Sequence, residues 1–533
     1  MTPATALLEA AAGMFPGRIA AADRRQALTY RQLHSLCLRA AGGLRQLGIR
    51  QGDRVAFLMK NSVEWVAAWY ACLYLGAIVV PLHTRLCPQE LLQVLTVSRC
   101  SALVLDAGFS DTLAYFRAQG LALAHTVCTG GQISSAAAWA QLTAGRGAPV
   151  PPADGGDDAP AMILYTSGTT GTPKGVVRRQ EDLVRHGQML AAQNNAPGRR
   201  DVMLSTSPLH HIGGLQGLLK MSVLAGTYVT MDRIKPEEIL RSIQEYRVTQ
   251  LQMLPPVTYE RLYRSGAWRD WDCSCVWEVC ISAGKCTTEY TDHIFRMFPN
   301  AHLRPSWGST EAGTISCAQM TREDLADSPA RIQSVGRLIP GVQLRIVGQN
   351  GAEVRPGLPG EALVRSPLVF DGYLDDPDHT AAAFTPDGWY RTGDIVSMNP
   401  EDGCLYFLDR REGQIKTGGE NVFALEVERI IQKHPDVQEC AVIGVPDPRF
   451  GEAIAAAVVC NPGRTISPEE LVRFCCQRMS SYKKPRYIAF LDQLPVNDVG
   501  KVQKSLLRDR WRTMFRPVPV ASGAVPAESK QGR

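Results

Sequence analysis

Segments with helical and with strand-like spacing of apolar residues alternate along the first part of the chain. Residues 27–59 carry a helix-like pattern and then a short apolar run, and residues 65–82, WVAAWYACLYLGAIVVPL, repeat that order. Further units of the same kind follow to about residue 320. Regular alternation of helices and strands predicts an α/β domain built around a buried sheet.

The segment 65–82 contains no charged residue. A membrane-spanning helix needs about 20 apolar residues, whereas this segment is interrupted by Gly76 and Pro81 and becomes β-branched near its end. The pattern therefore predicts a buried helix that stops at the glycine, followed by a short strand with the sequence AIVV. We expect no membrane span in this protein.

The spacing changes twice in the second half of the chain. Between residues 334 and 374, short apolar runs are separated by glycine and proline turns, which predicts a small β subdomain. After Asp409, the runs ECAVIGV, AIAAAVVC and YIAFL are typical of strands, and NVFALEVERIIQKHP and SPEELVRFCCQRM have helical spacing. These residues predict a compact α+β module of about 100 residues, an ordinary domain size.

The predicted organisation is a large N-terminal domain followed by a smaller one. Residues 1–408 hold the α/β sheets and the small β subdomain, residues 409–412 connect the two domains, and residues 413–515 form the α+β C-terminal domain. The tail, residues 516–533, has the composition of a disordered segment.

Composition narrows the class of protein. The chain has 533 residues, of which 45% are hydrophobic and 20% charged, as in a globular protein with more than one domain. A formal net charge of +5 is mild for this size and does not indicate a nucleic-acid-binding protein. The fifteen cysteines form no CxxC pair, and the N-terminus lacks the features of a signal peptide. We expect free thiols in a reducing, cytoplasmic setting.

The sequence YTSGTTGTPKG, residues 165–175, has the composition of a phosphate-binding loop. Its glycines and proline disfavour a regular element, and backbone N–H groups, hydroxyls and Lys174 can together surround an anion. The apolar run AMILY precedes the loop, and a strand-then-helix pattern follows it, so a plain flexible linker is disfavoured. The P-loop template requires glycine directly before its lysine, but Pro173 stands there.

This loop closely resembles the signature loop of the adenylate-forming superfamily, which includes acyl- and aryl-CoA synthetases, carrier-loading adenylation domains and beetle luciferases. Other motifs in the same order extend the resemblance from about residue 15 to residue 515. The resemblance implies that the loop holds the β- and γ-phosphates of ATP. The residues it assigns to that task are Thr166, Ser167, Gly168, Thr169, Thr170, Gly171 and Lys174.

The stretch SWGSTEAG, residues 306–313, resembles the family's segment for adenine and metal. Trp307 stands where the family usually has a tyrosine beside adenine, and Glu311 matches the family's magnesium ligand, a role that suits a hard carboxylate. Ser306, Gly308 and Thr310 belong to the same nucleotide site by this resemblance. Taken alone, STE is typical of an ordinary helix N-cap.

Two further motifs resemble parts of the family that contact ribose and move the C-terminal domain. Asp394 in WYRTGD matches a carboxylate that accepts hydrogen bonds from the sugar hydroxyls, and Arg410 matches a residue that contacts ribose and phosphate. Glu412 occupies the hinge position, about which the C-terminal domain would rotate between two half-reactions. Alone, these residues are also compatible with a turn and a surface arginine.

The C-terminal module contains two more matches. KTGGEN, residues 416–421, resembles the loop that lines the pantetheine tunnel, which assigns coenzyme A binding to Gly418, Gly419 and Glu420. Lys501 in VGKVQK matches the family's catalytic lysine, which reaches the carboxylate and the α-phosphate during adenylation. A surface turn and a solvated lysine are the alternatives from the residues alone.

The acid would bind near two motifs that depart from the family pattern. In PLHHIGG, residues 208–214, His211 takes the position of a catalytic gate histidine, but His210 replaces the usual phenylalanine. In SAGKC, residues 282–286, Lys285 replaces a proline, and either faces solvent or meets a polar group of the substrate. The residues assigned to the acyl pocket are His211, Gly213, Gly214, Ala283 and Gly308, with Gly284 beside adenine. Glycine at 308, where acetate-specific relatives have tryptophan, predicts an acid larger than acetate.

The resemblance implies an ATP-dependent acid–CoA ligase acting on a medium- or long-chain fatty acid or an aryl acid. ATP, Mg²⁺ and coenzyme A would be required, and Lys501, His211 and Glu311 would carry catalysis. The alternative acceptor is the phosphopantetheine arm of a carrier protein. Ser167 has no paired base in the sequence around it, which argues against a hydrolase. The presence of Lys501 and Glu311 argues against a non-catalytic nucleotide-binding regulator, and nothing indicates a luciferase-like oxygenation.

Overall fold

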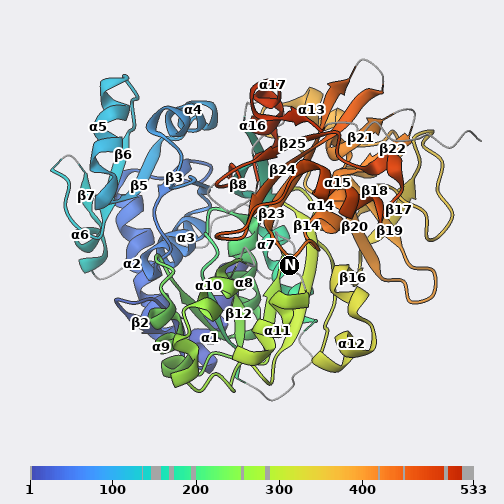
Figure 1. Ribbon diagram of the computed structural model, residues 1–533. Helices are drawn as coiled ribbons and strands as arrows, with labels where there is room; N and C mark the ends of the chain where they lie inside the picture. Colours follow the sequence, from blue (N-terminus) through green and yellow to red (C-terminus); the bar gives the residue numbers. More distant parts are fainter. Residues whose placement is uncertain are drawn as a thin grey trace, which may run out of the picture. The chain divides into compact units, whose positions relative to one another are not determined.

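The computed structural model describes residues 3–134, 136–145, 158–166, 173–193, 200–253, 257–282, 288–417, 420–447, 450–496 and 502–518 (Figure 1). The chain forms two compact units. The first holds the chain up to Leu358 with Ala362–Thr392 and Met398–Tyr406, and the second holds Pro359–Glu361, Gly393–Ser397 and the chain from Phe407 onward. The domain limits and the hinge given above stay predictions.

The uncharged segment forms the buried helix that its pattern predicts. Helix α3 (Val63–Leu75) begins after Ser62, whose hydroxyl accepts a hydrogen bond from the Trp65 N–H, and it ends at Gly76 with a φ of 66°. Strand β4 (Ile78–Pro81) follows. Every residue of α3 except Glu64 is buried, which explains its all-apolar sequence. Among the residues described, no helix is long and apolar enough to cross a membrane.

A seven-stranded sheet forms the first layer of the first unit. Its strand order is β7-β6-β5-β3-β4-β8-β9, with β9 antiparallel to β8. The strands are β3 (Arg54–Leu58), β4, β5 (Ala102–Asp106), β6 (His125–Thr129), β7 (Ala137–Ala138), β8 (Pro160–Thr166) and β9 (Lys174–Arg179). Side chains alternate across the sheet, because Val55 and Phe57 of β3 pack with α2 (Tyr30–Leu47) and α3, whereas Ala56 and Leu58 pack with α4 (Pro88–Ser98) and α5 (Ser110–Ala118).

The second sheet has thirteen strands in the order β17-β18-β19-β20-β16-β15-β14-β13-β12-β10-β11-β1-β2. These are β1 (Ile19–Ala22), β2 (Ala27–Thr29), β10 (Val202–Ser205), β11 (Thr227–Thr230), β12 (Gln250–Gln252), β13 (Glu278–Ile281), β14 (His302–Ser309), β15 (Gly313–Cys317), β16 (Ser334–Leu338), β17 (Gln343–Val347), β18 (Gly360–Arg365), β19 (Tyr390–Met398) and β20 (Leu405–Arg410). Strands β10 to β14 pair in parallel, and β15 pairs antiparallel with β14 and β16.

Helices cover both faces of the second sheet. One face packs against α9 (Pro236–Tyr246), α10 (Val257–Arg264) and α11 (Thr288–Met297). The other packs against α7 (Gln180–Ala191) and α8 (Ile212–Leu224), and both helices share one apolar core with the first sheet. The residues of α7 and α8 therefore lie in a layer between two sheets, where a polar side chain must find its partner inside the protein. Shorter helices of this unit are α1 (Ala4–Met14), α6 (Trp139–Ala144), α12 (Arg322–Asp327) and α13 (Pro377–Ala382).

The second unit is the predicted α+β module. Strands β23 (Val437–Asp447) and β24 (Gly451–Cys460) pair antiparallel in a sheet with β21 (Gln414–Thr417), β22 (Glu420–Phe423), β25 (Tyr487–Phe490) and β26 (Arg516–Pro517). One face packs against α14 (Ala424–Ile431) and α15 (Pro468–Cys476), and the other against α16 (Lys504–Asp509) and α17 (Trp511–Met514). These elements agree with the helical and strand-like spacing after Asp409.

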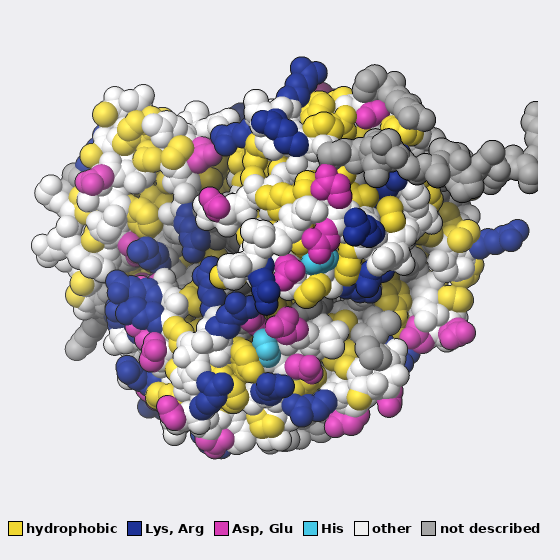
Figure 2. All heavy atoms as spheres, in the orientation of Figure 1, with side chains coloured by type: hydrophobic (Ala, Val, Ile, Leu, Met, Phe, Trp, Pro, Cys, Tyr) yellow, Lys and Arg dark blue, Asp and Glu magenta, His cyan; other side chains and the backbone are white. Residues whose placement is uncertain are grey.

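Charges of both signs are interspersed on the face of the molecule drawn in Figure 2. This distribution accords with a small formal net charge of +5 over 533 residues. The described cysteines are free thiols, and most of them are partly or fully buried.

Replacing Trp69 by alanine should destabilise the first unit by about 3–5 kcal/mol. Trp69 is fully buried in α3, with its indole N–H 3.3 Å from the sulfur of Met162 on β8, so its removal leaves a cavity between helix and sheet. Denaturant unfolding followed by far-UV circular dichroism measures the change. Leu358→Ala, at a side chain that is 53% exposed, is the control and should shift stability by less than about 0.5 kcal/mol. Equal effects of the two changes would contradict the packing described.

Candidate active site

Strands β8 and β9 form the base of the predicted phosphate loop. They pair antiparallel, with Thr166 opposite Lys174, and β8 carries the buried apolar run that precedes the loop in sequence. The hairpin therefore brings the first and last residues of the loop together. The predicted phosphate-binding residues between them, Ser167 to Gly171, lie outside the described part of the chain.

A tyrosine that the sequence does not single out connects this hairpin with the predicted metal ligand. The Lys174 ammonium lies 5.1 Å from the centre of the Tyr373 ring, and the Tyr373 hydroxyl donates a hydrogen bond of 3.2 Å to Glu311 Oε1. Backbone contacts hold the three segments together, since the Leu374 N–H donates to the Gly175 carbonyl and the Phe370 N–H donates to the Glu311 carbonyl. Lys174 and Glu311, two predicted ATP-site residues, thus belong to one contact network in the first unit.

Arg178 on β9 is a second residue that the sequence analysis does not select. Its side chain is fully buried, and Nη1 donates to the Leu368 carbonyl, whereas Nε and Nη2 have no hydrogen-bond partner among the described residues. Burial lowers the pKa of this guanidinium, and the carboxylates of Asp182, Glu311 and Asp371 act in the opposite direction. A buried cation therefore interacts electrostatically with Glu311, the predicted metal ligand. No local sequence pattern identifies Arg178 as a site residue.

The SWGSTEAG stretch forms a β-hairpin instead of a helix start. Strand β14 ends at Ser309, β15 begins at Gly313, and the Ser309 hydroxyl accepts a hydrogen bond from the Ala312 N–H within the turn. The turn exposes Thr310 and Glu311 partly, while the Trp307 side chain on β14 is buried. Ser306 and Trp307 pair with Cys317 and Ser316 of β15. The N-cap reading of STE is therefore wrong, and stacking of Trp307 on adenine stays a prediction.

Two glycines assigned to the acyl pocket are explained by close backbone approach. A Cβ atom at Gly308 would collide with the carbonyl oxygen of Gly313 across the β14–β15 hairpin. One at Gly214 would collide with the carbonyl of Pro208 in the turn before α8. The missing side chain at Gly308 thus permits strand pairing, and the space that we expected it to leave for a large acid is filled by backbone. The preference for an acid larger than acetate stays a prediction.

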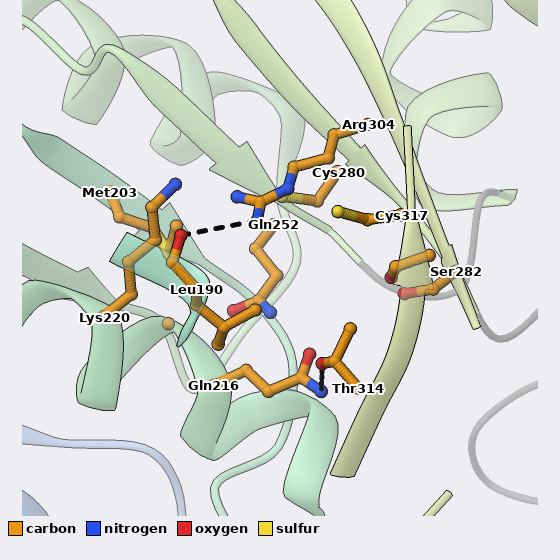
Figure 3. Close-up of a pocket in the computed structure, with 12 residues that line it drawn as sticks. Leu190, Met203, Gln216, Lys220, Gln252, Cys280, Ser282, Arg304, Thr314 and Cys317 are labelled. Carbon is orange, nitrogen blue, oxygen red and sulfur yellow. Dashed lines mark hydrogen bonds between the residues drawn. The ribbon is translucent and has the colours of Figure 1, made fainter. Parts of the chain in front are cut away.

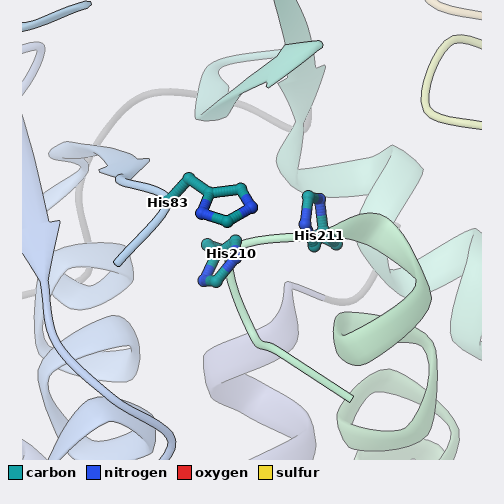
Figure 4. A group of neighbouring side chains, drawn as sticks. All are labelled: His83, His210 and His211. Atoms are coloured by element: carbon teal, nitrogen blue, oxygen red, sulfur yellow. The ribbon is translucent and has the colours of Figure 1, made fainter. Parts of the chain in front are cut away.

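Three histidines meet where the predicted gate lies (Figure 4). His83 follows β4, His210 lies in the turn before α8, and His211 is the N-cap of that helix. Their ring centroids are 4.4 Å apart for His83 and His210, 4.5 Å for His210 and His211, and 5.2 Å for His83 and His211. The sequence pattern PLHHIGG identifies two members of this cluster, and His83 joins it only through the fold.

Two members of the cluster, His210 and His211, are held in the neutral form. Burial, with the neighbouring His211, His83 and Arg85, keeps the pKa of His210 well below its usual value, and burial with His83 lowers the pKa of His211 to about 4. Within the described part of the chain, the buried Nε2 atoms of His210 and His211 have no hydrogen-bond partner. Because neutral imidazoles both donate and accept, these nitrogens can meet a polar group of a substrate.

The same three rings are the described group that comes nearest to a metal site. One nitrogen from each lies within 4.8 Å of the others. A tetrahedral ion with Zn–N distances of about 2.0–2.1 Å needs its nitrogens roughly 3.3 Å apart, so the rings would have to move together to bind one. Glu311, with its hard carboxylate oxygens, suits Mg²⁺ better by donor chemistry.

The two predicted ribose-site residues contact each other in the second unit. Asp394 lies on β19 and is 2% exposed, and its Oδ1 is 2.7 Å from Nε of the half-exposed Arg410 at the end of β20. A carboxylate that is anchored on one side by arginine keeps its other oxygen oriented, as binding of two adjacent hydroxyls requires. Asp394 and Arg410 therefore form an ion pair, and their assignment to ribose stays a prediction.

Several predicted site residues fall on parts of the chain that the structure does not describe. Lys501, Gly418, Gly419, Ala283, Gly284 and Lys285 lie outside the described residues, and the side chains of Glu412 and Glu420 are not described. Their assigned roles stay predictions.

Comparison with known proteins adds to this geometry. A family model described as AMP-binding enzyme matches residues 8–374, and one described as AMP-binding enzyme C-terminal domain matches residues 426–501. An indoleacetate–CoA ligase of Aromatoleum aromaticum is 34% identical over 93% of this chain and 96% of its own. The long-chain-fatty-acid–CoA ligase FadD13 of Mycobacterium tuberculosis is 32% identical over 91% of this chain and 93% of its own.

A solved structure of similar fold has a bound nucleotide. The O-succinylbenzoate coenzyme A synthetase of Bacillus subtilis in complex with AMP superposes with a TM-score of 0.82, at 27% identity, over 97% of this chain and 99% of its own. The likeness covers both units, so it extends beyond the nucleotide loop.

Replacing His210 by phenylalanine should make the protein's stability less dependent on pH below neutrality. The folded state keeps His210 neutral, whereas the unfolded chain binds a proton near pH 6.5, so acid favours unfolding. The wild-type melting temperature should therefore fall as the pH drops from 7.5 to 5.5, and the fall should be smaller for His210→Phe. His210→Gln, which also cannot titrate, should share the shallower slope. Parallel curves for all three proteins would show that His210 does not resist protonation.

Proposed function

Since the chain belongs to the AMP-binding enzyme family, we propose that it is an ATP-dependent acid–CoA ligase that forms AMP, acting on an aryl or fatty acid larger than acetate. The observation that carries the proposal is the network of Lys174, Tyr373 and Glu311 at the base of the phosphate loop. The network supports a site in which Lys174 contacts the phosphates of ATP and Glu311 binds the metal ion that accompanies them.

The proposed chemistry has two steps. The substrate carboxylate attacks the α-phosphorus of ATP, pyrophosphate leaves, and an acyl-adenylate forms. The thiolate of coenzyme A then attacks the acyl carbonyl, and AMP departs. Catalysis rests on positioning and charge neutralisation and needs no covalent nucleophile on the protein.

Residues of this chain take the following proposed roles. The loop from Thr166 to Lys174 holds the β- and γ-phosphates, Asp394 and Arg410 hold the ribose, and Trp307 lies beside adenine. Glu311 holds Mg²⁺, which when bound offsets the negative charge of the pyrophosphate group. Its donor set supports this role, because a carboxylate oxygen oriented by the Tyr373 hydroxyl is a hard ligand.

In this proposal, the acid and the thiol of coenzyme A reach the site by different routes. His211 stands at the gate to the acid. Its neutral imidazole has a buried Nε2 with no partner among the residues that the structure describes, which supports contact with a polar substrate atom. Gly418, Gly419 and Glu420 line the path of the pantetheine arm. A carrier protein's phosphopantetheine arm is the alternative acceptor. The free described thiols support a reducing, cytoplasmic location.

Incubation with ATP, Mg²⁺, coenzyme A and a panel of carboxylic acids tests the activity. We expect pyrophosphate, AMP and an acyl-CoA thioester from at least one aryl or fatty acid, with little product from acetate. Formation of ADP and phosphate would contradict adenylation. If pyrophosphate appears but the thioester forms only with a phosphopantetheinylated carrier protein, the alternative acceptor is correct.

Lys501→Ala should separate the two half-reactions. The lysine is proposed to meet negative charge that develops between the carboxylate and the α-phosphate, and loss of one such contact costs about 10²- to 10³-fold in rate. Pyrophosphate release should slow by that factor, whereas a supplied acyl-adenylate should still be converted to thioester at close to the normal rate.

Gly419→Leu is the complementary variant. A leucine side chain in the proposed pantetheine path should leave pyrophosphate release nearly unchanged and block thioester formation. If either variant slows both steps equally, the proposed rotation about Glu412 between two active arrangements is mistaken.

A further inference from the structure

A small polar pocket adjoins the motifs assigned to the acid (Figure 3). Gln216 and Gly217 on α8 follow the predicted acyl-pocket glycines, Gly213 and Gly214, after one intervening residue, and Ser282 directly precedes Ala283. The amide of Gln252, which also lines the pocket, donates a hydrogen bond of 2.8 Å to the Gly213 carbonyl. The pocket is therefore the continuation of the predicted acyl site into the layer between α8 and the second sheet.

Its lining combines apolar side chains, such as Leu190 and Met203, with several polar ones. Gln216 donates from Nε2 to Thr314 Oγ1 at 3.0 Å, and Gln252, Ser282, Ser306 and Arg304 contribute further polar groups. The pocket has a volume of about 30 Å³, enough for a water molecule or two. A long alkyl chain does not fit that volume, and its end would offer no hydrogen bond to the amide and hydroxyl groups that line the pocket.

Two of the lining residues, Lys220 and Arg304, belong to a buried ion network. Lys220 of α8 donates to Glu278 Oε1 at 2.9 Å and to Gln250 Oε1 at 2.6 Å, and Arg304 donates to the same carboxylate at 3.3 Å. Lys220, Glu278 and Arg304 are each at most 5% exposed. Burial opposes ionisation of Glu278, but Lys220 and Arg304 outweigh it and hold the pKa of this carboxyl well below its usual value.

The direct contacts of this network place two cationic side chains on one carboxylate. Gln250 extends it by donating to Asp201 Oδ1 at 2.7 Å, on the far side of its amide from Lys220. Lys220 and Arg304 both line the pocket. A pocket bounded by these donors is electrostatically suited to an oxygen atom with lone pairs or negative charge.

We propose that this pocket receives a hydrogen-bond-accepting oxygen substituent, a hydroxyl or a second carboxylate, on the end of the acid remote from the carboxylate that reacts. The inference rests on the proposed function, because it deepens the choice of acid at the same site. Gln216 and Lys220 then act as specificity-determining residues. They recognise the far end of the substrate and take no part in the chemistry.

Matched acids test the proposal in the full-length enzyme. Each set shares one aryl or alkyl skeleton and ends in a methyl group, a hydroxyl group or a carboxylate, and kcat/KM is measured for ATP- and acid-dependent pyrophosphate release. We expect the best hydroxyl- or carboxylate-bearing acid to exceed its methyl counterpart by about ten-fold or more, because a pocket built for hydrogen bonding rejects an analogue that lacks them. A best acid with a hydroxyl identifies a neutral acceptor, and a best acid with a carboxylate identifies an anion.

Gln216→Leu removes a pocket donor without leaving a buried charge. It should abolish most of the preference for the polar acid while the methyl-bearing acid keeps or gains activity. Gln188→Leu makes the same change at an exposed position on the neighbouring helix α7 and should keep the wild-type preference. Lys220→Met is a second test of the pocket lining. For this variant, the ratio of kcat/KM for the polar acid to kcat/KM for the methyl-bearing acid is measured on the folded fraction of the protein.

Two results would overturn the inference. One is a wild-type enzyme that uses methyl-bearing acids as well as or better than their polar partners, and the other is a Gln216→Leu enzyme with an unchanged preference. Either result would leave the ligase activity intact. Absence of pyrophosphate release with every acid would instead count against the proposed function, so the two failures are distinguishable.

Discussion

The layer of helices α7 and α8 between two sheets is the constraint on which the site depends. Helices in that position have sheet on both sides, so the polar groups that they bury need partners within the protein. Lys220 meets this requirement through Glu278 and Gln250, and His186 through Thr314. The first turn of α8, with His211 at its N-cap, inherits the same enclosed surroundings, which explains why its imidazole stays neutral.

The packing of the two sheets also explains why Lys174 and Glu311 lie near each other at the predicted phosphate loop. The β8–β9 hairpin is anchored in the first sheet, and the β14–β15 hairpin continues the second, so Lys174 and Glu311 come from different sheets of the first unit. Tyr373 bridges them from a third segment. A phenol can do this because one face of its ring attracts a cation while its hydroxyl donates to a carboxylate.

The parts of the fold that rest on local periodicity could be predicted from the sequence. Helix α3 with its glycine stop, the strand before the phosphate loop and the elements of the second unit all follow from apolar spacing and turn residues. Tyr373, Arg178 and the Lys220–Glu278 pair could not, because their partners lie far away in sequence; Lys220 and Glu278 are 58 residues apart. STE misleads for a related reason, since strand pairing with β15 overrides its local preference for a helix start.

Any Cβ atom at residue 308 would collide with the Gly313 carbonyl. This constraint affects how the enzyme's selectivity for its acid can change during evolution. A single substitution at that position cannot simply narrow the site, because the strand pairing would have to be rebuilt together with it. Gln216 lines the pocket and contacts the hairpin only through a side-chain hydrogen bond to Thr314, so its substitution leaves the backbone pairing of the two strands in place. Lineages that diverge from this chain in the acid they use should therefore differ first along α8, with the hairpin glycines unchanged.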